Sequence, residues 1–142
     1  MRQADTTAML QALAAFGPEL RAPDATAGKW SDQKGSGTVD DPLTMPYFES
    51  SELLDRFMNM TYEVGWVQDF DWMEWSREPE AKLLMRDSEV LSDATIEQLI
   101  NVITTLVRAD RFSEGTLARS FESGTLRALA ERAQALLLRS ER

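Results

Sequence analysis

Three arginines in the C-terminal part of the chain have the residue type and spacing of an anion-binding site. Residues 105–124 hold three arginines and three acids: Arg108, Arg111, Arg119, Asp110, Glu114 and Glu122. Guanidinium groups and the free backbone N–H groups of a helix start can together hold a phosphate or a carboxylate. An anion site usually keeps uncompensated positive charge, whereas the charges in this stretch balance. We therefore expect Arg108 or Arg111 to pair with an acid of the same stretch above a buried Phe112, with an anion site as the alternative.

Carboxylates in the middle of the chain could bind a basic protein. The formal net charge is −9, and residues 46–95 carry 12 acidic against 4 basic side chains. Tryptophans within this acidic segment could supply the aromatic anchors that protein interfaces use. The candidate protein-binding residues are Glu49, Glu52, Asp55, Asp69, Asp71, Trp72, Glu74, Trp75, Glu78 and Glu80.

These residues favour a non-enzymatic protein-binding module. In its sharper form the prediction is an inhibitor of the kind made by phages and mobile elements. Its carboxylates would stand in for the phosphates that a nucleic-acid-handling defence protein binds. An acidic face that is only solvated is the other interpretation.

Catalytic, metal and cofactor sites find little support in the residue types. The chain has no histidine and no cysteine, the residues that most often carry proton transfer, thiol chemistry and transition-metal binding. The acids around Asp71 do not follow the spacing of a calcium loop, and no glycine-rich phosphate loop precedes a helix. We predict no catalytic residue, no metal and no cofactor. A small enzyme or an anion-binding or small-ligand-binding protein that uses the corner from Arg108 to Glu122 is the alternative.

The charge and the cysteine content also bear on partners and compartment. A negative field repels nucleic-acid phosphates, so we expect no direct nucleic-acid binding. A chain without cysteine has no disulfide scaffold, which favours a cytoplasmic protein. No window reaches the roughly 18 apolar residues of a membrane span, so we expect no membrane contact.

The helical periodicity of the first two thirds predicts short helices around a loop-rich segment. A first helix, capped by Asp5 or Thr6, should end at residues 17–18. Residues 18–45 read as loop, with a short hairpin pairing the region of Trp30 with residues 43–45 across a tip at residues 35–37. A helix from Ser50 or Ser51 to Gly65 follows, then a short helix capped by Asp71 and another that starts at Pro79.

The C-terminal third gives the strongest helical patterns. Ser92 or Asp93 should cap a helix with apolar residues from Ile96 to Val107 at three- and four-residue steps. A short helix should begin at residues 113–114 and be closed by Gly124, before a last helix that buries Leu126, Leu129, Ala133, Leu136 and Leu137. The sequence thus predicts one domain over residues 1–142, mainly α, as a compact bundle of five or six short helices with a small β-hairpin or irregular loop appendage.

Several short motifs resemble those of one protein family. They are Pro46-Tyr47-Phe48, Gly65-Trp66, Phe70-Asp71-Trp72, the stretch from Arg108 to Phe112, and Glu114-Gly115. On these motifs the chain resembles a family of small bacterial proteins described only as a domain of unknown function, number 6508, over roughly residues 16–138. The resemblance implies a cytoplasmic single domain and carries no assigned activity.

Overall fold

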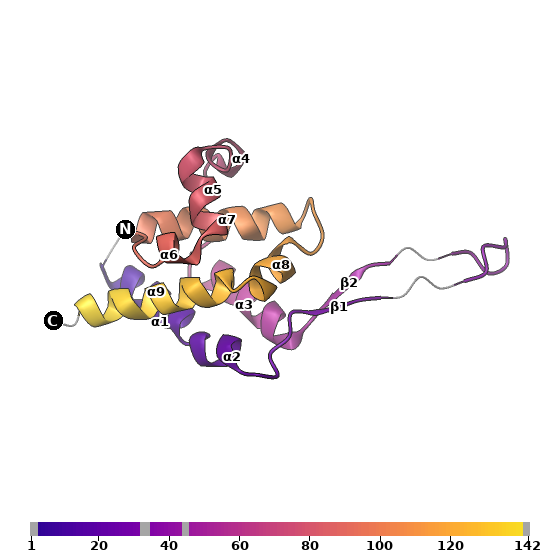
Figure 1. Ribbon diagram of the computed structural model, residues 1–142, viewed down its shortest axis with the longest axis horizontal. Helices are drawn as coiled ribbons and strands as arrows, with labels where there is room; N and C mark the ends of the chain where they lie inside the picture. The colour runs from indigo at the N-terminus through magenta and orange to yellow at the C-terminus, as the bar shows by residue number, and fades with distance from the viewer. Residues whose placement is uncertain (1–2, 32–34, 44–45, 141–142) are drawn as a thin grey trace.

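Helices form the body of the molecule, and two short strands begin an arm that projects from it (Figure 1). The computed structural model describes residues 3–31, 35–43 and 46–140. Its elements in chain order are α1 (Gln3–Ala14), α2 (Gly17–Arg21), β1 (Gly28–Trp30), β2 (Phe48–Ser50), α3 (Glu52–Glu63), α4 (Trp72–Trp75), α5 (Pro79–Arg86), α6 (Ser88–Leu91), α7 (Ile96–Asp110), α8 (Thr116–Glu122) and α9 (Thr125–Ser140). The expected fold class, mainly α with a small β appendage, is confirmed.

The core forms around α7, where residues 102–107 are buried without interruption. The long helix α9 packs along α1, and α8, α4 and α5 contact α7 (Figure 1). Phe16, just after α1, meets Phe57 of α3 edge to face at a ring separation of 5.4 Å. No helix in the described residues has both the length and the hydropathy of a membrane span.

Buried hydrogen bonds attach the segment before α4 to this core. The indole N–H of Trp66 donates to the backbone oxygen of Met9 over 3.0 Å. The hydroxyl of Thr104, in the middle of α7, donates to the backbone oxygen of Trp66 and accepts from the backbone N–H of Gln68, both over 3.1 Å. Thr104 is fully buried. Its hydroxyl therefore supplies both backbone groups with the hydrogen-bond partner that water would otherwise provide. One threonine therefore holds the chain in place just before it enters α4.

An ion pair joins α2 to α3. The guanidinium of Arg56 forms two hydrogen bonds to the carboxylate of Glu19, over 2.6 and 3.2 Å. The hydrogen bond from Arg56 lowers the pKa of Glu19, and the same contact raises the pKa of Arg56.

Local capping signals predicted some helix boundaries and missed others. Ser51 accepts from the N–H of Leu54 over 3.1 Å, and Asp71 accepts from that of Glu74 over 3.2 Å, so both predicted caps are confirmed. The predicted cap at Ser92 or Asp93 is wrong, because Thr95 forms the reciprocal capping pair with Gln98.

Other boundaries and short helices also differ from the prediction. The first helix starts at Gln3, so Asp5 and Thr6 lie inside it. The helix predicted to begin at residues 113–114 begins at Thr116. The short helices α2 and α6 lie where the sequence predicted none.

The hairpin exists, but with a different partner strand. Trp30 pairs with Phe48 and Lys29 with Glu49, in antiparallel register. The backbone N–H of Ser31 donates to the oxygen of Tyr47 over 2.7 Å and continues the ladder. Of the predicted partner segment, Leu43 does not pair with β1, and residues 44–45 lie outside the described residues. The register places the aromatic pair Trp30 and Phe48, 5.4 Å apart, at the base of the arm.

The predicted burial of Phe112 is wrong. Leu99 is fully buried, but the Phe112 side chain is 75 % exposed. The helix α7 ends at Asp110, so Phe112 follows a turn and no longer continues the buried stripe of α7. This exposed ring becomes part of the candidate site.

Candidate functional site

The loop between α7 and α8 is fixed at both ends by backbone hydrogen bonds to carboxylates. Asp110, the last residue of α7, accepts from the N–H of Leu117 in the first turn of α8 over 3.0 Å. Glu114 accepts from the N–H of Phe48 in β2. Two acids predicted to neutralise arginines therefore accept hydrogen bonds from backbone N–H groups instead.

An aromatic pair with one exposed ring lies where this loop meets α4. The ring of Phe112 stacks on that of Trp72 at 6.1 Å with an angle of 29° between their planes. Beside the pair is a hollow of about 250 Å³. We call the residues that line this hollow the α4–α7 corner. They are Gln68, Asp69, Phe70, Trp72, Met73, Arg108, Arg111 and Phe112.

The arginines of the corner are free of carboxylate partners. No ion pair joins Arg108 or Arg111 to an acid among the described residues, so the predicted ion pair within residues 105–124 is wrong. Arg111 instead donates to the hydroxyl of Tyr62 over 3.2 Å and lies 6.0 Å from the centre of that ring. Arg108 is half-buried and has no side-chain hydrogen bond to any described residue.

Arg119 does not join the other two arginines. It donates to the hydroxyl of Thr116 over 3.1 Å and lies near Gly115. That glycine has φ +90°, and a Cβ there would lie 3.2 Å from the ring of Trp30. The predicted three-arginine anion site is therefore reduced to Arg108 and Arg111.

The predicted protein-binding acids fall into two groups on different elements. In the first, Asp69 lines the hollow, Asp71 caps α4, and Glu74 and Glu78 are exposed between that cap and Pro79. Glu80 belongs to the same region, but its carboxylate accepts from the indole N–H of Trp75 over 3.3 Å and from the amide of Gln98 over 2.7 Å. The hydrogen bonds of Glu80 therefore join α5 to α4 and α7.

The second group lies at the base of the arm and the start of α3. Glu49 accepts from the hydroxyl of Tyr47 over 3.2 Å, which raises the pKa of Tyr47, and lies 4.0 Å from the ammonium of Lys29. Glu52 pairs with Arg56 over 3.8 Å, and Asp55 accepts from the hydroxyl of Ser50. These acids form hydrogen bonds or ion pairs with neighbouring side chains, and none of them lines the corner.

The two candidate tryptophans have different roles. Trp75 is buried and packs against Phe70 at 6.4 Å, whereas Trp72 is half-buried and stacks under Phe112. Only Trp72 can contribute to a surface. Sequence reasoning missed Tyr62, Gln68 and Met73 as neighbours of the arginines, because their approach depends on how α3 and α4 pack on α7.

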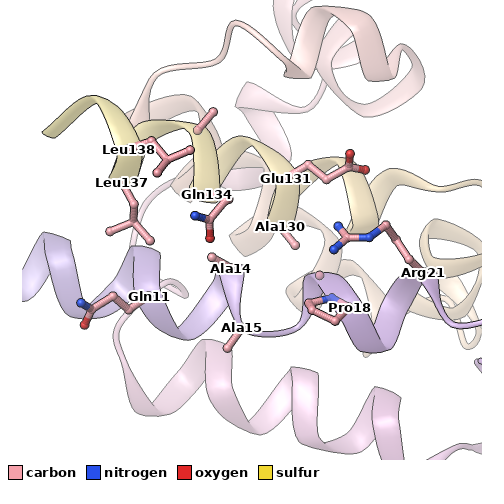
Figure 2. Close-up of a pocket in the computed structure, with 12 residues that line it drawn as sticks. Gln11, Ala14, Ala15, Pro18, Arg21, Ala130, Glu131, Gln134, Leu137 and Leu138 are labelled. Atoms are coloured by element: carbon pink, nitrogen blue, oxygen red, sulfur yellow. The ribbon is translucent and has the colours of Figure 1, made fainter. Parts of the chain in front are cut away.

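A second hollow, which the sequence did not indicate, lies between α1, α2 and α9 (Figure 2). Its volume is about 690 Å³, and its floor is built from small and apolar residues. We call it the α1–α2–α9 groove. Its lining is Gln11, Ala14, Ala15, Gly17, Pro18, Arg21, Ala130, Glu131, Gln134, Ala135, Leu137 and Leu138.

The two hollows differ in the chemistry that their linings offer. The corner offers guanidinium donors beside aromatic faces, a combination that holds a carboxylate or phosphate attached to an apolar group. Among the described residues no three acids lie close enough together to hold a metal ion.

Comparison with known proteins identifies a family and no activity. A family model described as a family of unknown function, DUF6508, matches residues 5–139. No curated protein and no solved structure matches the chain.

Proposed function

Because the chain belongs to the DUF6508 family, which has no assigned function, we propose from its surface that it is a non-enzymatic protein-binding module whose contact surface is the α4–α7 corner. The observation that carries the proposal is the exposed Phe112, stacked on Trp72 beside two arginines that form no ion pair with any described acid. We place this activity in the cytoplasm, since the chain has no cysteine for disulfide formation.

The residue types of the corner match those of interface anchors. Tryptophan, phenylalanine, methionine and arginine are enriched in the centres of protein interfaces, and all four occur here with Trp72, Phe112, Met73 and Arg108. A large aromatic side chain buries roughly 150–250 Å² when it is covered. A partner that covers Phe112 therefore gains hydrophobic free energy that the isolated chain does not obtain.

Charges of both signs surround this apolar centre and set the chemistry of the partner. Arg108 and Arg111 line the hollow from the α7 side, and Asp69 lines it from the segment before α4. Asp71 at the cap of α4 and Glu74 in its first turn add further acids nearby in the chain. The partner should bring a carboxylate to the arginines and basic side chains to the acids of α4. A basic, nucleic-acid-handling protein would supply the second contact, so we retain an inhibitor of such a protein as the sharper form of the proposal.

The test compares two corner variants with a matched surface control. Phe112→Ala and Arg108→Ala remove one aromatic anchor and one guanidinium, whereas Leu83→Ala removes an exposed apolar side chain from α5. Each immobilised protein is incubated with a cell lysate, and the retained proteins are quantified by mass spectrometry. We expect proteins that bind the wild type and Leu83→Ala to be lost with both corner variants.

Stability measurements show whether lost binding reflects a lost fold. Phe112→Ala should cost less than about 1 kcal/mol because the ring is exposed, whereas removal of a fully buried ring such as Phe57 should cost about 3–5 kcal/mol. If Phe112→Ala and Arg108→Ala retain the same proteins as the wild type, the corner is not the contact surface and the proposal is wrong.

A small anionic ligand is the second candidate, favoured by the hollow itself and by Arg108, which no described acid pairs with. Titration with phenyl phosphate and with inorganic phosphate, followed by NMR, tests it. Saturable binding of phenyl phosphate that disappears in Arg108→Ala would favour a ligand site. Shifts spread over the whole surface would contradict one.

A further inference from the structure

The tip of the arm presents an apolar side chain on a hydrogen-bonded turn. The backbone N–H groups of Ser36 and Gly37 donate to the oxygen of Asp41 over 3.2 and 3.0 Å, and the N–H of Asp41 returns to the oxygen of Thr38 over 3.2 Å. Val39, within this turn, is 99 % exposed, and Leu43 after it is 54 % exposed. We call residues 35–43 the arm tip. Within the described part of the chain, Val39 is left uncovered and Leu43 is covered only in part.

The α1–α2–α9 groove is an apolar surface that also lacks a cover. Alanines of α1 and α9 line the groove with small side chains, and Leu138, which is 52 % exposed, also lines it. In Figure 2, Arg21 extends from α2 toward α9 at the edge of the groove. Arg21 has no ion pair or side-chain hydrogen bond with any described residue, whereas Glu131 of the same groove pairs with Arg127 over 3.5 Å. The groove therefore offers apolar area and one uncompensated positive charge.

We propose that the arm tip of one copy of this chain docks into the α1–α2–α9 groove of a second copy. Val39 and Leu43 lie on the alanines and Leu138, and the carboxylate of Asp40 meets the guanidinium of Arg21. Asp40 has no side-chain partner among the described residues, so the free charges of tip and groove are opposite in sign. This charge complementarity identifies the occupant of the groove as another copy of the arm.

The direction of the arm requires that the two surfaces come from different molecules. The arm projects away from the body, while the groove lies on the body between α1, α2 and α9 (Figure 1, Figure 2). Each copy carries both a tip and a groove, so reciprocal docking closes as a twofold dimer. The α4–α7 corner shares no lining residue with the groove, and this inference does not rest on the proposed function.

The oligomeric state in solution tests the proposal directly. Sedimentation velocity of the full chain over a concentration series should show a dimer in exchange with monomer. Val39→Asp should shift the wild-type dimer to monomer, whereas the control Leu83→Asp, at an exposed apolar position on α5, should leave the dimer intact. Circular dichroism confirms that each variant is folded.

A charge exchange tests the orientation of the arm in the groove. Arg21→Glu alone and Asp40→Lys alone should each weaken the dimer. A mixture of these two variants should restore it, because each tip then meets a groove of opposite charge. A wild type that stays monomeric at its highest soluble concentration overturns the proposal. It is equally overturned by a dimer that survives Val39→Asp, or by a mixture that dimerises no better than the single variants.

Discussion

Replacement of Thr104 by valine should destabilise the protein far more than its small chemical change suggests. Valine has nearly the shape of threonine, so no cavity forms, but the hydroxyl that binds the oxygen of Trp66 and the N–H of Gln68 is lost. A buried backbone group without a partner costs about 1–3 kcal/mol. The oxygen of Trp66 is buried, whereas Gln68 is only partly buried and regains some hydration. We therefore expect a loss of about 2–4 kcal/mol in the free energy of unfolding.

The neighbouring Thr105 provides the matched control. It is also buried in α7, but its hydroxyl donates only to the backbone oxygen of Asn101 in its own helix, over 2.7 Å. That oxygen keeps its helical hydrogen bond in Thr105→Val, so this variant should lose less than about 1 kcal/mol. Urea unfolding followed by circular dichroism gives both values, and amide exchange should quicken at Gln68 in Thr104→Val alone. Equal losses in the two variants would refute the view that Thr104 anchors the segment before α4.

Two further predictions concern a glycine and an ion pair. Gly115→Ala should cost more than Gly65→Ala in thermal unfolding. Both glycines have positive φ, a conformation that costs an alanine about 1–2 kcal/mol. Only the Cβ added at position 115 would contact a side chain, the ring of Trp30 at 3.2 Å. Equal losses in the two variants would contradict this contact. The lowered pKa of Glu19 means that its ion pair with Arg56 stabilises the fold above the unfolded pKa and is lost as the pH falls through the folded one. The wild type should therefore be more stable than Glu19→Gln at neutral pH and lose this advantage in acid. Urea midpoints over a pH series measure the difference. A difference that does not change with pH would exclude the ion pair as its source.

The helix caps could be predicted where the signal is local. Ser51 and Asp71 bind backbone groups three residues ahead, so the sequence contains both partners. Thr95 and Gln98 carry the same kind of signal, the threonine and glutamine of a capping box, and could have been found. They were missed because Ser92 and Asp93 are equally good capping residues, and only the presence of α6, which ends at Leu91, decides between them.

The charged residues of the corner could not be assigned in this way. Asp110 and Glu114 stand next to arginines in the sequence, which suggested ion pairs. In the structure Asp110 binds the start of the next helix, and Glu114 binds a strand 66 residues away. Backbone N–H groups compete with guanidinium groups for these carboxylates, and the positions of those N–H groups depend on tertiary packing. The exposure of Phe112 likewise follows from the direction of the turn after α7, which helical periodicity does not describe.

The four tryptophans lie in three environments, so their fluorescence can report on different parts of the protein. Trp66 and Trp75 are buried, Trp72 lies in the corner against Phe112, and Trp30 is exposed at the base of the arm. The two buried indoles should emit at short wavelengths and stay insensitive to quenchers while the fold is intact. Single replacements of Trp72 or Trp30 by phenylalanine therefore separate the signal of a partner at the corner from that of the arm, without any attached dye.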